Sequence, residues 1–291
     1  MMTVELIGNT YAIELERMGN GLVKDDNLVI AAAAKQCYNK NFNYIEFYNN
    51  HINENKTKNQ EFIKRIADSG HTSILEHASA TFLITGVSRA LTHQLVRHRI
   101  ASYTQQSQRY VDMEDFKFVI PPSILKCNNE EVLTEYNYIM NRIEKSYKFL
   151  VSELVKSGRT EQQAREDARF VLPNAAETQI VMTMNYRELG DFLGKRMCMR
   201  AQWEIRALAT EIFNIMSKQS PGIFGKNAIY RGPKCKTLGY CNEGHSCGMM
   251  LTLDQLSGKQ PTVKETEDVK RGSLWSRIID IILLRKYMFQ R

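Results

Sequence analysis

Three adjacent side chains, Arg97, His98 and Arg99, open the segment of this chain with the richest chemistry. Residues 100–108 add hydroxyl and amide groups without any charge, and Arg109 closes the segment. Guanidinium groups offer planar pairs of donors to phosphate oxygens, while Gln and Ser can bind the donor and acceptor groups of a heterocyclic ring. The pattern predicts a binding loop for a phosphorylated ligand that carries many heteroatoms.

This segment also fits a surface ion-pair cluster, a serine nucleophile or a nucleic-acid surface. A generic Arg-His-Arg tripeptide is more often a surface cluster held by ion pairs. However, no Asp or Glu occurs between His77 and Asp112, which favours a ligand site. Ser107 is better explained as a hydrogen-bond donor than as a nucleophile, since no spacing here implies an adjacent base held by a third group. A basic nucleic-acid surface with Tyr103 and Tyr110 as stacking platforms is the competing hypothesis.

The composition limits the class of protein and the kind of partner that we expect. The 291 residues are 43% hydrophobic and 24% charged, as in an ordinary globular protein, and the net charge of +7 favours an anionic partner. The chain begins without an apolar signal region and contains no run of about 18 apolar residues. We therefore expect a cytoplasmic protein without a membrane span, whose six cysteines are free thiols.

The elements that must position these side chains follow from hydrophobic periodicity and capping signals. Strands and helices mix without a regular βαβ period, which predicts an α+β (mixed α/β) class in one domain of residues 1–230. Neither a Rossmann nor a P-loop glycine pattern occurs, so arginine side chains must hold phosphate. We predict strands at 78–85, 116–120 and 180–184, and helices at 27–38, 61–68, 88–96, 132–154, 160–172, 187–200 and 202–218.

Several side chains outside the opening segment could also act. Arg196 shares a helical pattern with Leu189, Phe192 and Leu193, so it can point inward, where a buried Arg needs an anionic partner. On the same helix, the i,i+4 spacing of Arg187–Asp191 and Asp191–Lys195 is typical of weak surface ion pairs. In the polar run 70–77, His71 suits a ligand loop or a turn equally, and His77 is expected to be a packing residue.

A family resemblance rests on these residues. Arg97-His98-Arg99, followed by seven residues and Ser107, matches the signature of the flavin-dependent thymidylate synthases. The resemblance covers residues 1 to 235 and includes the stretches 70–77, 87–94, 107–110, 168–173, 184–187 and 200–205.

The resemblance implies the thymidylate synthase-complementing fold, with a central, mostly antiparallel sheet flanked by helices. It also implies a homotetramer whose FAD-bearing active sites are shared between subunits. The substrate would be dUMP, converted to dTMP with 5,10-methylenetetrahydrofolate as carbon donor and NADPH as reductant of the flavin. A flavoprotein that keeps FAD but has lost thymidylate synthesis is the alternative within this class, and neither nucleic acid nor a metal is required.

The resemblance also assigns roles by position. Arg196 would polarise the uracil ring, Arg109 and Arg169 suit the dUMP phosphate, and no cysteine nucleophile is needed. The residues implied for FAD are Ser73, Arg97, His98, Arg99, Gln105, Asn185, Arg187 and Asp191. Those implied for dUMP are Gln94, Arg97, Gln105, Gln106, Ser107, Gln108, Arg109, Arg169 and Arg196.

Three positions depart from the family pattern. Gln105 stands where some members carry Glu, and Asp191 where others present Asn or His to the flavin. Cys37 occupies a position where a Ser can touch the cofactor, and a buried small residue explains it equally well.

Residues 231–291 are predicted to form two further parts. Residues 231–250 are rich in cysteine, with Cys235, Cys241, His245 and Cys247 close in sequence. A zinc site is one interpretation of these residues, but their spacing lacks the short C-x2-4-C pair of common zinc modules, which favours a segment without metal. Residues 251–291 are expected to be a linker and a basic amphipathic tail, for which an interfacial helix, a subunit contact and an extension all stay open.

Overall fold

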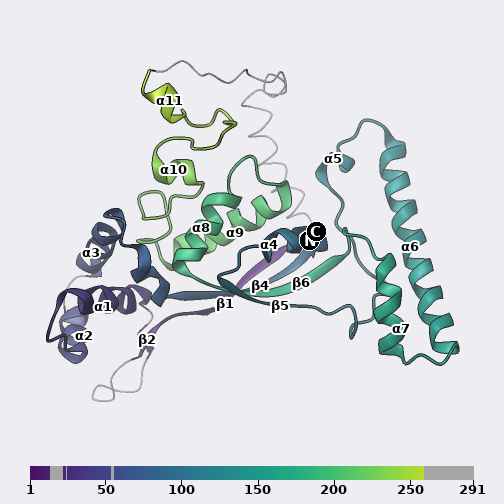
Figure 1. The fold of residues 1–291 in the computed structure, drawn as a ribbon, viewed down its shortest axis with the longest axis horizontal. Coiled ribbons are helices and arrows are strands. Elements are labelled where there is room, and N and C mark those ends of the chain that lie inside the picture. Colours follow the sequence, from purple (N-terminus) through teal and green to yellow (C-terminus); the bar gives the residue numbers. More distant parts are fainter. Residues whose placement is uncertain (14–21, 24, 54–55, 259–291) are drawn as a thin grey trace.

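The computed structural model describes residues 1–13, 22–23, 25–53 and 56–258, so the predicted tail at 259–291 lies outside the described residues. A four-stranded antiparallel sheet with strand order β1-β4-β6-β5 forms its centre (Figure 1). The strands are β1 (Thr3–Asn9), β4 (Ser79–Ser88), β5 (Ala101–Gln105) and β6 (Glu177–Asn185). A small second sheet pairs β2 (Ala12–Ile13) with β3 (Leu22–Val23).

One face of the sheet carries the main core. Strand β4 alternates buried and partly buried residues, and its buried Phe82 pairs with buried Met182 of β6. Helices α4 (Arg89–Leu95), α8 (Tyr186–Arg196) and α9 (Trp203–Gln219) cover this face with leucine, isoleucine and phenylalanine side chains. The sheet and its covering helices confirm the predicted α+β class.

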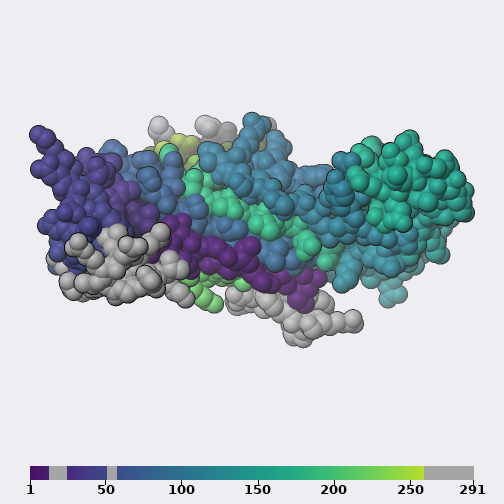
Figure 2. Space-filling view, turned by 90° about the horizontal axis from the view of Figure 1, so that it is seen from below, coloured from purple at the N-terminus to yellow at the C-terminus, as the bar shows by residue number. Residues whose placement is uncertain are grey.

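Lobes at both ends make the molecule elongated (Figure 2). One lobe consists of α1 (Asp26–Tyr38), α2 (Tyr44–Asn53), α3 (Lys56–Asp68) and the 3-10 helix η1 (Thr72–His77). The other consists of α5 (Pro122–Leu125), α6 (Glu130–Lys156), α7 (Glu161–Ala168) and the 3-10 turn η2 (Arg169–Val171), around a separate core that includes Tyr147 and Ala164. Among the described residues, no helix has the length and apolarity needed to cross a membrane.

Two local predictions are wrong. Residues 116–120 do not form a strand, since Phe118 makes only an isolated bridge to Ala176, and Phe116 packs into the core of the α6–α7 lobe. Conversely, residues 101–105, expected to be loop, form edge strand β5 against β6. The small and polar side chains of β5 hide its strand character, because β6 supplies the backbone partners.

A buried hydroxyl fixes the start of α8. Tyr186 is fully buried, and its hydroxyl lies 2.5 Å from Asp26 Oδ2, 2.8 Å from Asn9 Oδ1 and 3.0 Å from Ser220 Oγ. These contacts join β1, α1 and the end of α9 to the first residue of α8. Burial raises the pKa of Asp26, while its hydrogen bonds with Ser220 and Tyr186 oppose that shift.

Two glycines of α8 provide a matched test of packing. A Cβ at Gly190 would lie 2.2 Å from the Tyr230 ring, which stacks on Phe224, whereas a Cβ at Gly194 would lie 3.6 Å from the nearest atom, in Lys234. We expect Gly190→Ala to lower the free energy of unfolding by roughly 1–3 kcal/mol, because an aromatic ring must move. Gly194→Ala should be neutral or stabilising by up to about 1 kcal/mol, since alanine favours helix. Denaturant titration of both variants checks this, and equal losses would contradict it.

Candidate active site

The turn after α4 presents the opening tripeptide. α4 is capped by Ser88, whose side chain accepts from Leu91 N, and the His98 backbone donates to Leu95 O at 3.1 Å. The Tyr103 hydroxyl of β5 lies 2.9 Å from the carbonyl oxygens of both Leu95 and His98, so the strand holds the turn. Segments on either side of this turn therefore fix its conformation.

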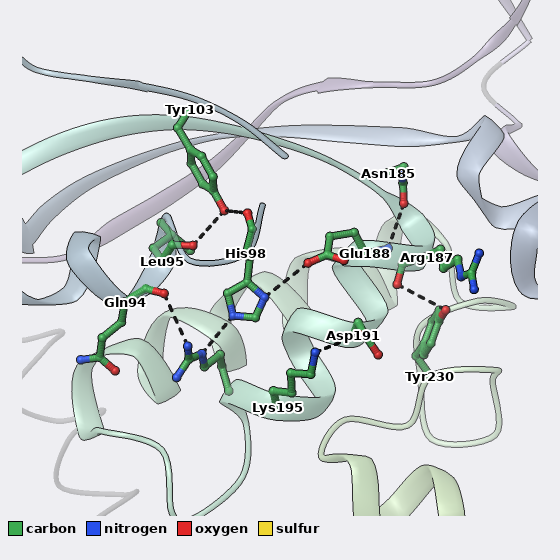
Figure 3. Close-up of polar contacts among 11 residues, drawn as sticks. Gln94, Leu95, His98, Tyr103, Asn185, Arg187, Glu188, Asp191, Lys195 and Tyr230 are labelled. Atoms are coloured by element: carbon green, nitrogen blue, oxygen red, sulfur yellow. Dashed lines mark hydrogen bonds and ion pairs between the residues drawn. The ribbon is translucent and has the colours of Figure 1, made fainter. Parts of the chain in front are cut away.

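The His98 ring is the buried centre of the site, with only 7% of the residue exposed. Its Nδ1 faces Glu188 Oε1 at 3.4 Å (Figure 3). Its Nε2 accepts a 3.0 Å hydrogen bond from Arg196 Nε. Phe192 meets the ring edge-on, with centroids 5.0 Å apart. Burial and the positive charge of Arg196 lower the pKa of His98 to about 4. At neutral pH the ring is therefore uncharged, and the hydrogen-bond network assigns its proton to Nδ1.

Arg196 is half-buried at the last residue of α8. Its Nη2 also points to Gln94 O at 3.5 Å, and burial together with the charge of Arg97 lowers its pKa. Contrary to the sequence-based expectation, its partner is the neutral His98, and within the described residues Arg196 forms no ion pair. A guanidinium held on one edge by neutral groups keeps its other donors for an anion.

Arg97 and Arg99 flank the buried histidine and are themselves exposed. Neither forms an ion pair with any residue that the structure describes, so the alternative of a salt-bridge cluster is not supported. The tripeptide thus has one buried and two outward-facing members. Gln94 is half-buried just before it on α4.

A second arginine group lies where β5 approaches the α6–α7 lobe. Arg109 pairs with Glu166 at 3.0 Å, and Arg169 Nε donates to the Glu166 carbonyl at 3.3 Å. Arg89 joins them: its Nη2 donates to Gln106 O at 3.1 Å, and burial and the charge of Arg169 lower its pKa. The Nε atoms of Arg89 and Arg109 are buried without a hydrogen-bond partner in the described part of the chain. Unused guanidinium donors near like charges suit a bound anion.

Arg89 has no role in the sequence-based assignment, although it lies inside the stretch 87–94 that carries the resemblance. Its position just after the Ser88 cap brings it beside the end of β5. Only the pairing of β5 with β6 shows this proximity. No sequence spacing could have indicated it.

The residues between β5 and Arg109 are held by short contacts. Gln105 Nε2 donates to Thr92 Oγ1 at 3.0 Å and lies 3.4 Å from Thr178 Oγ1, and Gln106 N donates to Gln179 O. Ser107 Oγ accepts from Arg109 N at 3.2 Å, and no base contacts it among the described residues. Gln108 is half-buried beside them. Ser107 is therefore placed as a hydrogen-bonding group.

A third group lies at the start of α8 and in η1. Asn185 caps α8 by accepting from Glu188 N at 2.8 Å, which leaves its amide nitrogen for another partner. Arg187 pairs with Glu76 of η1 at 2.5 Å, so the expected Arg187–Asp191 pair is wrong. The expected pair of Asp191 with Lys195 forms at 3.0 Å. Ser73 is exposed in η1.

Other expected positions need correction. His77 is exposed like His71, so its predicted packing role is wrong. Cys37 is also exposed, with its thiol 3.6 Å from Ala33 O, which excludes the buried-residue account of it. Cys37 lies in the last turn of α1, and His77 is the last residue of η1.

The lowered pKa of His98 predicts a pH effect on stability. Its value rises from about 4 in the folded chain to about 6.5 on unfolding, so the unfolded state binds more protons between these values. Stability contributed by this group is lost as the pH falls from 7 to 5, by about 2 kcal/mol. Denaturant titrations of the wild type and of His98→Gln at both pH values test this. Parallel losses in the two proteins would contradict it.

An α+β fold with three groups of arginine and amide side chains around one helix and one sheet edge is suited to anionic ring-containing ligands. The family described as "Thymidylate synthase complementing protein" matches residues 21–222 of the chain. This match defines the class of protein to which the fold and site belong.

Individual relatives make the assignment more specific. A flavin-dependent thymidylate synthase from Nitratidesulfovibrio vulgaris is 45% identical over 225 residues, covering 76% of this chain and 89% of the relative. Proteins of the same name from Clostridium tetani (45% over 238 residues, 78% and 91% covered) and Geobacter sulfurreducens (48% over 198 residues, 67% and 79% covered) are also similar. The chain belongs to the flavin-dependent thymidylate synthases, and it is an enzyme of that family.

Proposed function

We propose that the protein converts dUMP to dTMP, with 5,10-methylenetetrahydrofolate as carbon donor and NADPH as the reductant of a bound FAD. One observation carries this proposal beyond the family assignment: Arg196 is held by neutral groups and has no ion pair in the described chain. Such a guanidinium can stabilise negative charge on a uracil ring without transferring a proton.

The donor set fits FAD. Exposed Arg97 and Arg99 form no ion pair with a described residue and can offer their guanidinium groups to a pyrophosphate, and the amide nitrogen of Asn185 can donate to an acceptor on a ring. We propose that these residues, with Ser73, Gln105, Arg187 and Asp191, hold the cofactor. When bound, the flavin supplies the hydride that completes the methyl group. The protein's own task at this site is to orient the cofactor and the substrate and to exclude water.

The second arginine group fits the substrate phosphate. Arg109 and Arg169 flank Glu166. A dianionic phosphate would replace the Glu166 carboxylate as the partner of Arg109. Arg89 adds positive charge from the sheet side. Ser107, Gln106, Gln108 and Gln94 remain available for the sugar and base, with Gln105 between the two ligand regions.

His98 acts on the substrate through Arg196. Its Nε2 accepts from Arg196 Nε, and its Nδ1–H points to Glu188. We propose that Glu188 orients the imidazole and that the imidazole orients the guanidinium. His98 is implied for FAD by the resemblance, but its buried ring is used by Arg196 and Glu188, so positioning is its main contribution.

Large exposed apolar side chains next to the site support a shared active site in a homotetramer. Ile100 is 68%, Tyr110 65% and Phe170 84% exposed, and each is a sequence neighbour of a proposed ligand residue. Such residues around a polar site are typical of a subunit contact. We propose that a second copy of the chain covers them and completes the site.

The visible spectrum of the purified protein, followed by NADPH oxidation and dTMP formation with dUMP and methylenetetrahydrofolate, tests the function. We expect bound flavin and dTMP production that requires all three substrates. A colourless protein that takes up no added FAD would contradict the proposal. Flavin binding and NADPH oxidation without dTMP would instead establish the flavoprotein that has lost synthesis.

A further inference from the structure

Glu204 is a buried carboxyl group that lies outside the three groups of proposed ligand residues. It is the second residue of α9, and only 4% of it is exposed. The N-cap residue of this helix, Gln202, accepts a hydrogen bond from Glu204 N at 3.0 Å. Within the described residues Glu204 forms no ion pair. Because burying a carboxyl group without a cation is unfavourable, this position requires a compensating contact.

Both oxygens of the Glu204 carboxyl group contact a single residue, Ser88, which lies 116 positions earlier in the chain and is itself buried. Oε1 accepts from Ser88 N at 2.7 Å, and Oε2 accepts from the Ser88 hydroxyl at 2.5 Å. Burial raises the pKa of Glu204, and the hydrogen bonds from Ser88 oppose that shift. Hydrogen bonds to an ionised acceptor are stronger than neutral ones, so this pair links α9 firmly to the end of β4.

The Ser88 hydroxyl is also the N-cap of α4. It accepts a hydrogen bond from Leu91 N at 3.0 Å. A hydroxyl group has a single hydrogen to donate, and here Glu204 accepts it, so the lone pairs of the oxygen are directed to the helix. A hydroxyl that donates to a carboxylate also becomes a better acceptor. Glu204 therefore determines how Ser88 caps α4.

Helix α4 carries proposed ligand residues at both of its ends. Arg89, its first residue, donates from its backbone N to Ala176 O and from Nη2 to Gln106 O, both at 3.1 Å. Gln94 lies in the last turn, just before the turn that presents Arg97–Arg99. α4 has seven residues, too few for stability on its own, and it contacts α9 on the sheet (Figure 1). A change at its N-cap would therefore displace Arg89 directly.

We propose that Glu204 is a positioning residue for dUMP: by holding Ser88 it fixes the start of α4, and thereby the place of Arg89 beside the substrate phosphate. This inference rests on the proposed function, because it concerns the same dUMP site. Glu204 acts through Ser88 and Arg89 and does not itself contact the substrate. Since the phosphate takes no part in the chemical step, loss of this contact should weaken dUMP binding and leave turnover at saturation nearly unchanged.

Steady-state kinetics of Glu204→Gln test this role. The amide has nearly the shape of the carboxylate, but it has one acceptor oxygen and no charge, so it cannot accept from both Ser88 donors. We expect KM for dUMP to rise about tenfold, with kcat within about twofold of the wild type. Glu211→Gln is the matched control, because Glu211 lies further along α9 and its carboxylate accepts from Asn214 of the same helix at 3.4 Å. It should keep the wild-type KM.

A double-mutant cycle with Arg89 separates positioning from a purely structural role. Arg89→Gln should raise KM for dUMP, and adding Glu204→Gln to it should raise KM by less than about threefold, because the connection to the phosphate has already been removed. If Glu204→Gln does not fold, Ser88→Ala removes the same contact from the other side and is measured in its place. An unchanged KM, a loss of kcat at constant KM, or the same tenfold rise in both backgrounds would overturn the inference.

Binding of dUMP to the flavin-loaded protein, measured by isothermal titration calorimetry, distinguishes failure of this inference from failure of the proposed function. We expect Glu204→Gln to bind dUMP about tenfold more weakly than the wild type while retaining its flavin. A wild type that binds dUMP and forms dTMP, together with a Glu204→Gln variant of equal dUMP affinity, would overturn only the role of Glu204. A wild type that does not bind dUMP would overturn the proposed function and this inference with it.

Discussion

Replacing Arg196 by alanine is expected to lower kcat for dTMP formation by roughly 10²–10³-fold while FAD stays bound. The guanidinium is held by His98 at 3.0 Å and by the Gln94 carbonyl at 3.5 Å, so its geometry is set before any ligand arrives. Donors that need no reorganisation stabilise developing charge most effectively in a site that excludes water. The measurement is steady-state dTMP formation at saturating dUMP, with flavin absorbance recorded for each preparation.

Two further variants make the Arg196 result specific. Arg196→Lys keeps the charge but loses the planar donors, so it should recover only a small part of the activity. Arg142→Ala makes the same chemical change on an exposed position of α6 and should keep wild-type activity. Full turnover in Arg196→Ala would remove this residue from the mechanism, and loss of flavin in that variant would assign it to cofactor binding.

Replacing Arg109 by glutamine is expected to lower kcat/KM for dUMP by roughly 10²-fold, chiefly by raising KM. Arg109 pairs with Glu166 and has a buried Nε without a partner in the described chain, so its donors are available to a phosphate. A charge-assisted contact of this kind contributes about 1.5–3 kcal/mol. Because the phosphate does not take part in the chemical step, the loss should fall on binding.

A substrate without a phosphate group distinguishes a role of Arg109 in phosphate binding from a role in maintaining the structure. With deoxyuridine in place of dUMP, the wild type and Arg109→Gln should have similar, low activity, since the removed contact has no partner. Arg165→Gln is the matched control, because Arg165 lies in α7 and pairs with Glu161 as Arg109 pairs with Glu166, but it has no proposed role in phosphate binding. An equal loss of activity with both substrates would mean that Arg109 maintains structure and does not bind phosphate.

Local sequence signals predicted many elements of this fold. The Thr160–Gln163 capping box begins α7, and the apolar periodicity of residues 132–154 corresponds to α6. The strand predictions failed where pairing with a neighbouring strand, and not the local sequence, determines whether a strand forms. Strand β5 forms because β6 offers a ladder, and Phe116–Ile120 fails as a strand because it pairs at a single bridge.

In the candidate site, too, local features could be predicted from the sequence and long-range contacts could not. Arg97 to Arg109 could be recognised as a ligand segment, because residue types and their spacing are local properties. The contact of His98 with Arg196 could not, since the two lie 98 positions apart, and neither could the approach of Arg89 to Gln106 across the sheet edge. Long-range contacts depend on how elements pack, which no single segment specifies.

The sequence by itself thus determined the α+β class, the family and the set of arginine and amide side chains available to a phosphorylated ring. Tertiary structure decided which of these groups lie together: a neutral His98 between Glu188 and Arg196, and an Arg89 beside the proposed phosphate site. The physical reason is that burial and neighbouring charge set the state of a side chain, and both arise only when distant segments pack.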